Sequence, residues 1–145
     1  MDLKLFEEAR PRAVLVAVSG ERGEEECLRS LDELAALLDT AGGAEAARVI
    51  QNRDTPDKAT YIGSGKAKEI AELLRADGGI GLAVFDNELT PSQIANLEDI
   101  LETRVLDRTM LILDIFALHA VTGEGKLQVE LAQLKYLLPR LTGKG

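Results

Sequence analysis

The pattern of apolar and polar positions in the first part of the chain predicts strands and helices that follow one another. Residues 13–19 form an almost entirely apolar run, which is typical of a strand buried on both faces of a sheet. Residues 24–38 repeat apolar side chains at helical spacing, and their first turn carries glutamates that suit the helix dipole. Gly42 and Gly43 end this helix, and residues 44–51 are predicted to be a second strand.

Predicted strands and helices continue to follow one another up to residue 106. A polar loop at residues 52–59 is followed by a strand-like segment at residues 61–63 and by a helix over residues 67–74. Residues 80–85 and 104–106 are predicted strands, and the helix between them begins with the residues of a capping box, Thr90, Pro91 and Gln93. We therefore expect an α/β fold with a small, mostly parallel sheet of about four strands flanked by helices.

The last third of the chain has a different pattern, with two helices predicted around a small polar tip. Leucine and isoleucine recur at steps of three and four in both arms, as in the a/d seam of a coiled coil. The positions are Leu111, Ile115 and Leu118 in the first arm, and Leu127, Leu131, Leu134, Leu138 and Leu141 in the second. The glycines of residues 122–125 permit a chain reversal between the arms.

This pattern predicts an antiparallel helical hairpin after the sheet. We expect two subdomains, an α/β part at residues 1–106 and a hairpin at residues 107–145. The seam of the hairpin is local in sequence, so its helices can pair within one chain or between two chains. A homodimer through the hairpin is therefore one expected assembly.

Composition narrows the classes of protein to consider. Cys27 is the only cysteine of the chain, which excludes an internal disulfide and a multi-cysteine metal site, and we expect it to be a buried thiol. No apolar run approaches the ~20 residues of a membrane span, and the charged N-terminus differs from a signal peptide. We therefore expect a cytoplasmic location.

The charge of the chain is unevenly distributed. The net charge is −8, which argues against a nucleic-acid partner for the chain as a whole. From Arg104 onward, however, six basic residues face four acidic ones, which leaves +2 there and −10 upstream. A surface that binds RNA would therefore belong to the hairpin.

Two kinds of catalytic centre are not supported by the residues. A P-loop needs a glycine where Thr60 lies and a hydroxyl where Ala67 lies, so GTP hydrolysis is not assigned to this chain. The lone histidine, His119, has no second metal ligand and no triad partner at a suitable spacing, and a surface role near a helix end is expected. We predict no catalytic residue and no metal site.

One candidate ligand site lies at the predicted carboxyl edge of the sheet. The turn at Gly63, Ser64, Gly65 and Lys66 opens a helix, where free backbone N–H groups can hold an anion. Asp86 and Glu88 follow a strand that ends at the same edge, and their oxygens could hold magnesium. Binding or weak hydrolysis of ATP or GTP is thus an alternative function, weighed against a plain glycine turn beside a solvated acidic loop.

The order of motifs resembles one family closely. The segments are TYIGSGKAKEI, VFDNELTPSQIANLE, DRTMLILDIFALHA and EGKLQVELAQLKYLLPRLTG, which together cover over half of the chain. They are similar to the N-terminal part of the HflX family of ribosome-associated GTPases. The resemblance implies a parent protein that continues into a P-loop GTPase domain, absent from this chain, which would require GTP and magnesium.

The resemblance also implies a function for the hairpin. In the family, the hairpin loop is understood to reach the peptidyl-transferase region of the large ribosomal subunit. By position, the residues that match the family pattern are Thr122, Glu124, Gly125, Lys126 and Gln128. Lys126 would contact phosphate and Gln128 a base or sugar, while His119 could stack on RNA. Several relatives have basic residues where this chain has His119, Val121 and Gly123.

Overall fold

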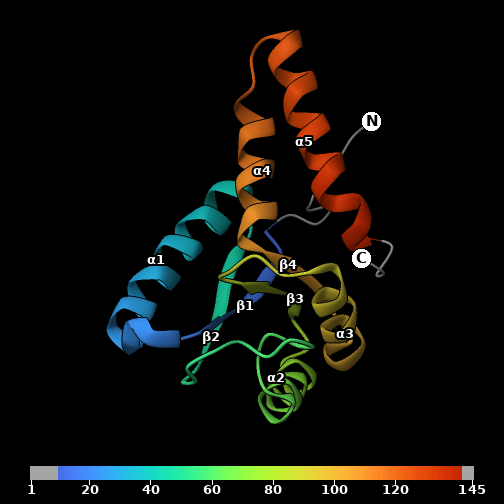
Figure 1. The fold of residues 1–145 in the computed structure, drawn as a ribbon. Coiled ribbons are helices and arrows are strands. Elements are labelled where there is room, and N and C mark those ends of the chain that lie inside the picture. Colours follow the sequence, from blue (N-terminus) through green and yellow to red (C-terminus); the bar gives the residue numbers. More distant parts are fainter. Residues whose placement is uncertain (1–9, 142–145) are drawn as a thin grey trace.

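The central feature of the fold is a four-stranded parallel sheet. The computed structural model describes residues 10–141. Its strands are β1 (Arg12–Val18), β2 (Ala44–Gln51), β3 (Ile80–Phe85) and β4 (Arg104–Asp107). They lie in the order β2-β1-β3-β4, and every neighbouring pair is parallel (Figure 1). The predicted α/β class is confirmed.

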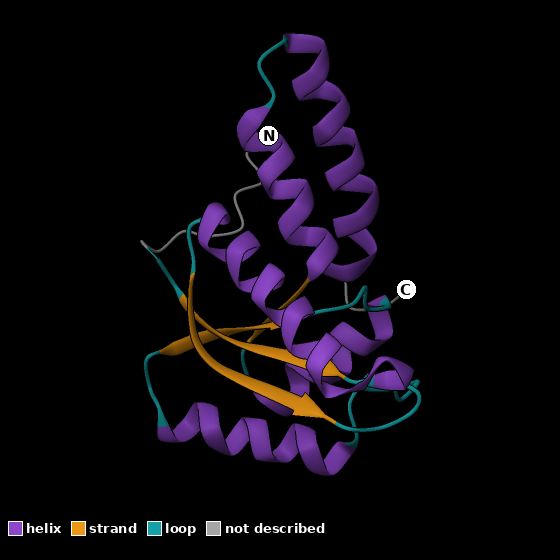
Figure 2. Cartoon of the chain, turned by 90° about the vertical axis from the view of Figure 1, so that its left-hand side faces the viewer, coloured by secondary structure: helices purple, strands orange, loops and turns teal. Residues whose placement is uncertain are grey.

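Helices cover both faces of the sheet. A short 3-10 helix, η1 (Gly20–Arg22), leads into α1 (Gly23–Ala41), which packs with α4 (Arg108–His119) on one face. On the other face α2 (Ser64–Ala76) packs against α3 (Pro91–Leu101) (Figure 2). This division follows from right-handed crossovers, because the chain moves outward from β1 to β2 and then back across β1 to β3.

The core forms where the sequence is most continuously apolar. Residues 13–18 of β1 and 82–85 of β3 are buried, because each of these strands has neighbours on both sides and helices above and below. Each fully buried leucine, valine or phenylalanine contributes about 1.5–3 kcal/mol relative to an exposed side chain. Cys27 is buried in this core, as predicted.

The start of α3 has the predicted capping box. The backbone N of Gln93 donates to Thr90 Oγ1 at 3.1 Å, and the backbone N of Thr90 donates to Gln93 Oε1 at 3.0 Å. Pro91 occupies the first turn, where its missing N–H costs nothing. These bonds satisfy helix N–H groups that would otherwise lack partners.

The strand-like segment at residues 61–63 is not a strand of the sheet. Asp57 and Tyr61 form only an isolated antiparallel bridge, and Tyr61 has a φ of 64°. The Asp57 carboxylate accepts hydrogen bonds from the backbone N of Ala59 at 2.8 Å and of Thr60 at 3.0 Å. This local turn reverses the chain before α2, which explains why apolar residues here are buried without joining the sheet.

The last two helices lie side by side and run in opposite directions. The first is α4, and the second is α5 (Gly123–Leu141). Both views show them projecting away from the sheet, with the connection at residues 120–122 at the far end (Figures 1 and 2). Met110 and Leu111 are buried at the base, whereas Val121 at the far end is 88% exposed. No helix in the described part of the chain meets the length and hydropathy expected of a membrane span.

The predicted leucine seam of α5 is wrong in its orientation. Leu127, Leu131, Leu138 and Leu141 are between 49% and 68% exposed, and Leu118 of α4 is 62% exposed. The buried side chains of α5 are Gln133 and Leu137 instead. Polar contacts of Tyr136 and Arg140 at the base fix the rotation of α5 and leave the leucine stripe facing outward.

Candidate functional site

The connection between α4 and α5 ends at Thr122, which caps the first turn of α5. Thr122 Oγ1 accepts a hydrogen bond from the backbone N of Gly125 at 2.9 Å, and Thr122 O accepts one from the backbone N of Lys126 at 2.9 Å. A Cβ atom on Gly125 would lie 2.8 Å from Thr122 Oγ1. Glycine at position 125 therefore allows the threonine to cap the first turn of α5.

The side chains around this turn face solvent. Thr122, Glu124, Lys126 and Gln128 are exposed, as is His119 at the end of α4. No ion pair with another described residue holds Lys126. We call this group of residues, together with Gly125, the tip. The exposed side chains of the tip lie at the projecting end of the α4–α5 pair, where they can contact a partner.

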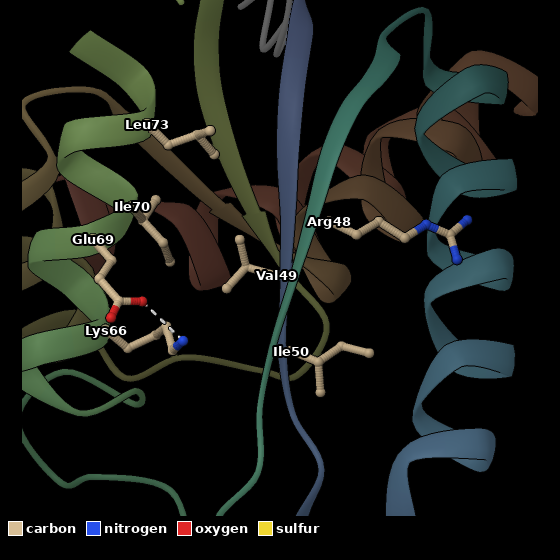
Figure 3. A pocket seen from close by; sticks show the side chains of 7 residues that line it. All are labelled: Arg48, Val49, Ile50, Lys66, Glu69, Ile70 and Leu73. Atoms are coloured by element: carbon tan, nitrogen blue, oxygen red, sulfur yellow. Dashed lines mark ion pairs between the residues drawn. The ribbon is translucent and has the colours of Figure 1, made fainter. Parts of the chain in front are cut away.

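The turn at the start of α2 lies apart from the tip. The backbone N of Gly63 donates to Gln51 Oε1 at 2.8 Å, and Ser64 and Gly65 are exposed. Lys66 Nζ pairs with Glu69 at 2.9 Å. Figure 3 shows both side chains in a pocket of about 370 Å³ between β2 and α2, which is lined by Arg48, Val49, Ile50, Lys66, Glu69, Ile70 and Leu73.

Asp86, the acidic residue predicted beside this turn, belongs to a different environment. Its side chain is fully buried after β3 and accepts hydrogen bonds from Arg22 Nη2 at 3.0 Å, Ser30 Oγ at 2.7 Å and Arg108 Nη1 at 2.9 Å. Glu88 is exposed. Neither acid lines the pocket that contains Lys66. No cluster of His, Cys, Asp and Glu suited to a metal ion occurs among the residues that the structure describes.

The partners of Asp86 are residues that sequence reasoning did not single out. Arg108 opens α4 and also reaches Glu33 on α1, with Nη2 at 3.0 Å from Glu33 Oε2. Arg22 lies beside Cys27, and its Nη2 donates to Cys27 Sγ at 3.3 Å. Burial raises the pKa of the Cys27 thiol, although the arginine opposes this effect. The only signal in the sequence was the position of Asp86 at the carboxyl end of a strand.

A second polar group joins the base of α5 to the sheet. Asp107 is fully buried and accepts hydrogen bonds from the backbone N of Leu89 at 2.9 Å, the backbone N of Met110 at 3.0 Å and the hydroxyl of Tyr136. The Arg140 guanidinium stacks on the Tyr136 ring at 3.5 Å from the ring centre and donates to Leu89 O at 2.9 Å.

Burial dominates the electrostatics of this group. It raises the pKa of Asp107, although the Leu89, Tyr136 and Met110 donors and the Arg140 charge oppose the rise. Burial and the neighbouring Asp107 carboxylate both raise the pKa of Tyr136. The tyrosine hydroxyl therefore remains protonated and acts as a donor to Asp107.

Comparison with protein families divides the chain near the end of α4. The family model described as GTP-binding GTPase N-terminal matches residues 28–117, and the one described as GTP-binding GTPase Middle Region matches residues 119–145. The first match covers most of the α/β part together with nearly all of α4, and the second covers α5.

Curated relatives match nearly the whole chain. A GTPase HflX of Lacrimispora saccharolytica is 51% identical over 99% of this chain and 33% of its own length. A GTPase HflX of Escherichia coli is 47% identical over 92% of this chain and 31% of its own length. The chain therefore spans about a third of the length of the curated relatives it matches.

Solved structures agree with these matches. A crystal structure of SsGBP in complex with GDP has a TM-score of 0.65 and 31% sequence identity, and the match covers 91% of this chain and 36% of that chain. A GTP-binding protein of the archaeon Sulfolobus solfataricus, also in complex with GDP, has a TM-score of 0.61 and 30% identity, with coverage of 91% and 38%.

Proposed function

Because this chain belongs to the HflX family of GTP-binding proteins, we propose that it is a ribosome-binding and regulatory N-terminal module of a longer GTPase. In this proposal the tip of the α4–α5 pair contacts RNA of the large ribosomal subunit. GTP and magnesium belong to the remaining part of the longer parent, because the residues of this chain do not form a P-loop. The module contributes binding and orientation.

The observation that carries the proposal is the projection of an exposed tip away from the sheet (Figure 1). Lys126 can contact a phosphate, and Gln128, half a helical turn further along α5, can bond to a base edge or to a ribose hydroxyl. The acidic charge of the chain is concentrated before Arg104, so RNA would repel the α/β part and favour approach through the α4–α5 pair.

The direct test is cosedimentation with large ribosomal subunits. We expect the Lys126→Ala, Gln128→Ala double variant to bind several-fold more weakly than the wild type at physiological salt. Loss of one phosphate contact should also reduce the slope of log affinity against log salt by about one. Lys68→Ala is the matched control, because Lys68 is exposed on α2 and the same charge is removed far from the tip.

The outcome has a simple interpretation if circular dichroism shows that all variants are folded. Equal binding of the double variant and the wild type would contradict the assignment to the tip. Equal weakening by Lys68→Ala would mean that binding depends on total charge and not on the tip. Binding of neither variant nor wild type would contradict the ribosome proposal itself.

The exposed leucines of α5 suggest where the rest of a longer parent would pack. Leu127, Leu131 and Leu138 form an apolar stripe along α5 that nothing in the described part of the chain covers. We propose that the remainder of the parent, including its GTPase domain, covers this stripe. A second copy of the chain is the other candidate for the same surface, and the two differ in whether a longer protein still self-associates.

Nucleotide binding by the α/β part is the second candidate function. The exposed start of α2 at Ser64 and Gly65 favours it, since a helix N-terminus can hold a phosphate. The three donors that already occupy the Asp86 carboxylate weaken its predicted role as a magnesium ligand. Calorimetric titration with ATP and GTP, with and without magnesium, decides the question, and an affinity no better than millimolar would remove this candidate.

A further inference from the structure

The buried polar contacts around Asp86 and those around Asp107 both involve one short loop, residues 86–89. The side chain of Asp86 at the start of the loop is held by Arg22, Ser30 and Arg108. The backbone of Leu89 at its end is held from both sides, because its N donates to Asp107 and its O accepts from Arg140. The loop therefore connects β3 to both helices of the projecting pair.

The α4 side of this connection is ionic. Arg108 is the first residue of α4, and its guanidinium spans from Asp86 Oδ1 at 2.9 Å to Glu33 Oε2 at 3.0 Å. This places the start of α4 between the loop and α1. A buried carboxylate with two arginine partners is costly to disturb, since breaking one contact leaves charge without compensation.

The α5 side depends on a tyrosine and an arginine one turn apart. The Tyr136 hydroxyl donates to Asp107, while Arg140 stacks on the tyrosine ring and donates to Leu89 O. Asp107 also caps α4 through the backbone N of Met110 at 3.0 Å. One carboxylate therefore fixes the start of α4, the base of α5 and the end of the loop together.

We propose that the loop at residues 86–89 is a joint that sets the direction in which the α4–α5 pair projects. Asp86, Asp107, Tyr136 and Arg140 are then positioning residues for the tip, although none of them lies at the tip. The same contacts transmit a displacement of the tip to the carboxyl edge of the sheet. The consequence for RNA rests on the proposed function, whereas the joint itself does not.

The length of α5 makes the tip sensitive to small changes at the joint. Its 19 residues span about 28 Å at a rise of ~1.5 Å per residue. A tilt of roughly 10° at the base would move the far end by about 5 Å over that length. Such a shift exceeds the tolerance of a hydrogen bond, so loss of a joint contact changes what the tip can reach.

The joint is tested by measuring distances between spin labels in the free chain. Labels are attached at Glu124→Cys on the tip and Lys68→Cys on α2, and Cys27 is retained because it is buried and accepts a hydrogen bond from Arg22 of the joint. The wild-type joint should give one narrow distance distribution. Tyr136→Phe, which removes the hydroxyl but keeps the ring beneath Arg140, and Asp86→Asn should each broaden or shift the distribution by several ångströms.

A matched control separates positioning from stability. Ile70→Val truncates a buried side chain of α2 without touching the joint, and it should lower the melting temperature without changing the distance distribution. Unchanged distributions in both joint variants would overturn the proposal. Equal broadening by Ile70→Val would also overturn it, because general loosening would then explain the effect.

A second experiment tests whether the joint affects binding by the tip. Tyr136→Phe should weaken binding to large ribosomal subunits several-fold although every tip residue is intact, and it should leave the Lys126 dependence in place. Changed distances with unchanged ribosome binding would support the joint and contradict its consequence for RNA. Changed binding with unchanged distances would contradict the joint.

Discussion

Asp107 is a buried carboxylate that connects the base of α4 to the base of α5. It accepts hydrogen bonds from Leu89, Met110 and Tyr136 and lies 4.0 Å from Arg140 Nε. Burial nevertheless raises its pKa, which means that removing water from the charged form outweighs the gain from these donors. This balance can be measured as a dependence of stability on pH.

The sign of that dependence follows from proton binding. An unfolded aspartate titrates near pH ~3.9, and folded Asp107 holds its proton to a higher pH. Between the two pKa values the folded state binds more protons than the unfolded state, so the contribution of Asp107 to stability falls as pH rises. It is fully present below the unfolded pKa and is lost as pH rises through the folded pKa.

We predict that Asp107→Asn removes this component. The free energy of unfolding of the wild type, minus that of the variant, should decrease from about pH 4 toward neutrality. Urea unfolding at a series of pH values measures the difference, and its slope matters because the substitution also changes the hydrogen bonds. A difference that increases with pH would mean that the donors, and not burial, control Asp107.

Among the helices, α5 shows why the spacing of apolar residues predicts an apolar face of a helix but not which neighbouring element that face contacts. Leu137 is 5% exposed, whereas Leu131 is 49% exposed, and the two lie on different sides of the helix. The leucine pattern was correct as a stripe, yet Tyr136 and Arg140 turn the stripe away from α4. Their partners, Asp107 and Leu89, are distant in sequence, so the pattern alone could not reveal the rotation.

This orientation gives a direct prediction for stability. Leu137→Ala should lower the free energy of unfolding by about 2–5 kcal/mol, because it leaves a cavity at the base of the helix pair. Leu131→Ala should change it by no more than about 0.5 kcal/mol, as for other surface positions. Chemical denaturation of both variants, at low protein concentration, makes the comparison. Equal losses would restore the predicted seam.

Other elements could be predicted because their signals are local. The apolar runs of β1 and β3 identify central strands, and the capping box of α3 fixes its first turn. The position of Asp86 at the carboxyl edge was also predictable. Its partners were not, since Arg22 and Arg108 lie 64 and 22 residues away and no periodic pattern connects them. The burial of Asp86 at this edge depends on contacts with arginines that come close to it only in the folded chain.

For the whole molecule, the distribution of charge and apolar surface gives the two parts different roles. The α/β part has a continuous core and most of the negative charge. The α4–α5 pair has little core of its own beyond its base and exposes large apolar side chains along its length. Monomeric proteins rarely expose a contiguous apolar patch larger than a few hundred Å², so this surface is suited to a partner.

A second copy of the chain could cover this surface if the α5 helices of the two copies pack against each other in parallel orientation. The stripe positions Leu127, Leu131 and Leu138 then face their equivalents. Glu130 and Lys135 flank the stripe on opposite sides, so a parallel pair places Glu130 of one copy near Lys135 of the other. If the chain is the N-terminal module of a longer protein, as proposed above, the remainder of that protein would compete for the same leucines, because a covalently linked partner has a high effective concentration.

We therefore predict that the 145-residue chain self-associates as its concentration rises and that a longer protein containing the GTPase domain does so much less. Sedimentation velocity over a range of concentrations measures both. Leu131→Glu with Leu138→Glu should keep the chain monomeric, because each change places charge in the apolar contact. Leu73→Glu is the control, since Leu73 is 36% exposed on α2, away from the stripe.

The charge arrangement tells the two candidate partners apart. Lys135→Glu should weaken self-association of the short chain, and adding Glu130→Lys should restore it, because the pair is then exchanged. In the longer protein the same two changes should not alter the oligomeric state. A short chain that remains monomeric at every concentration would exclude a second copy and leave the remainder of the parent as the partner that the stripe fits.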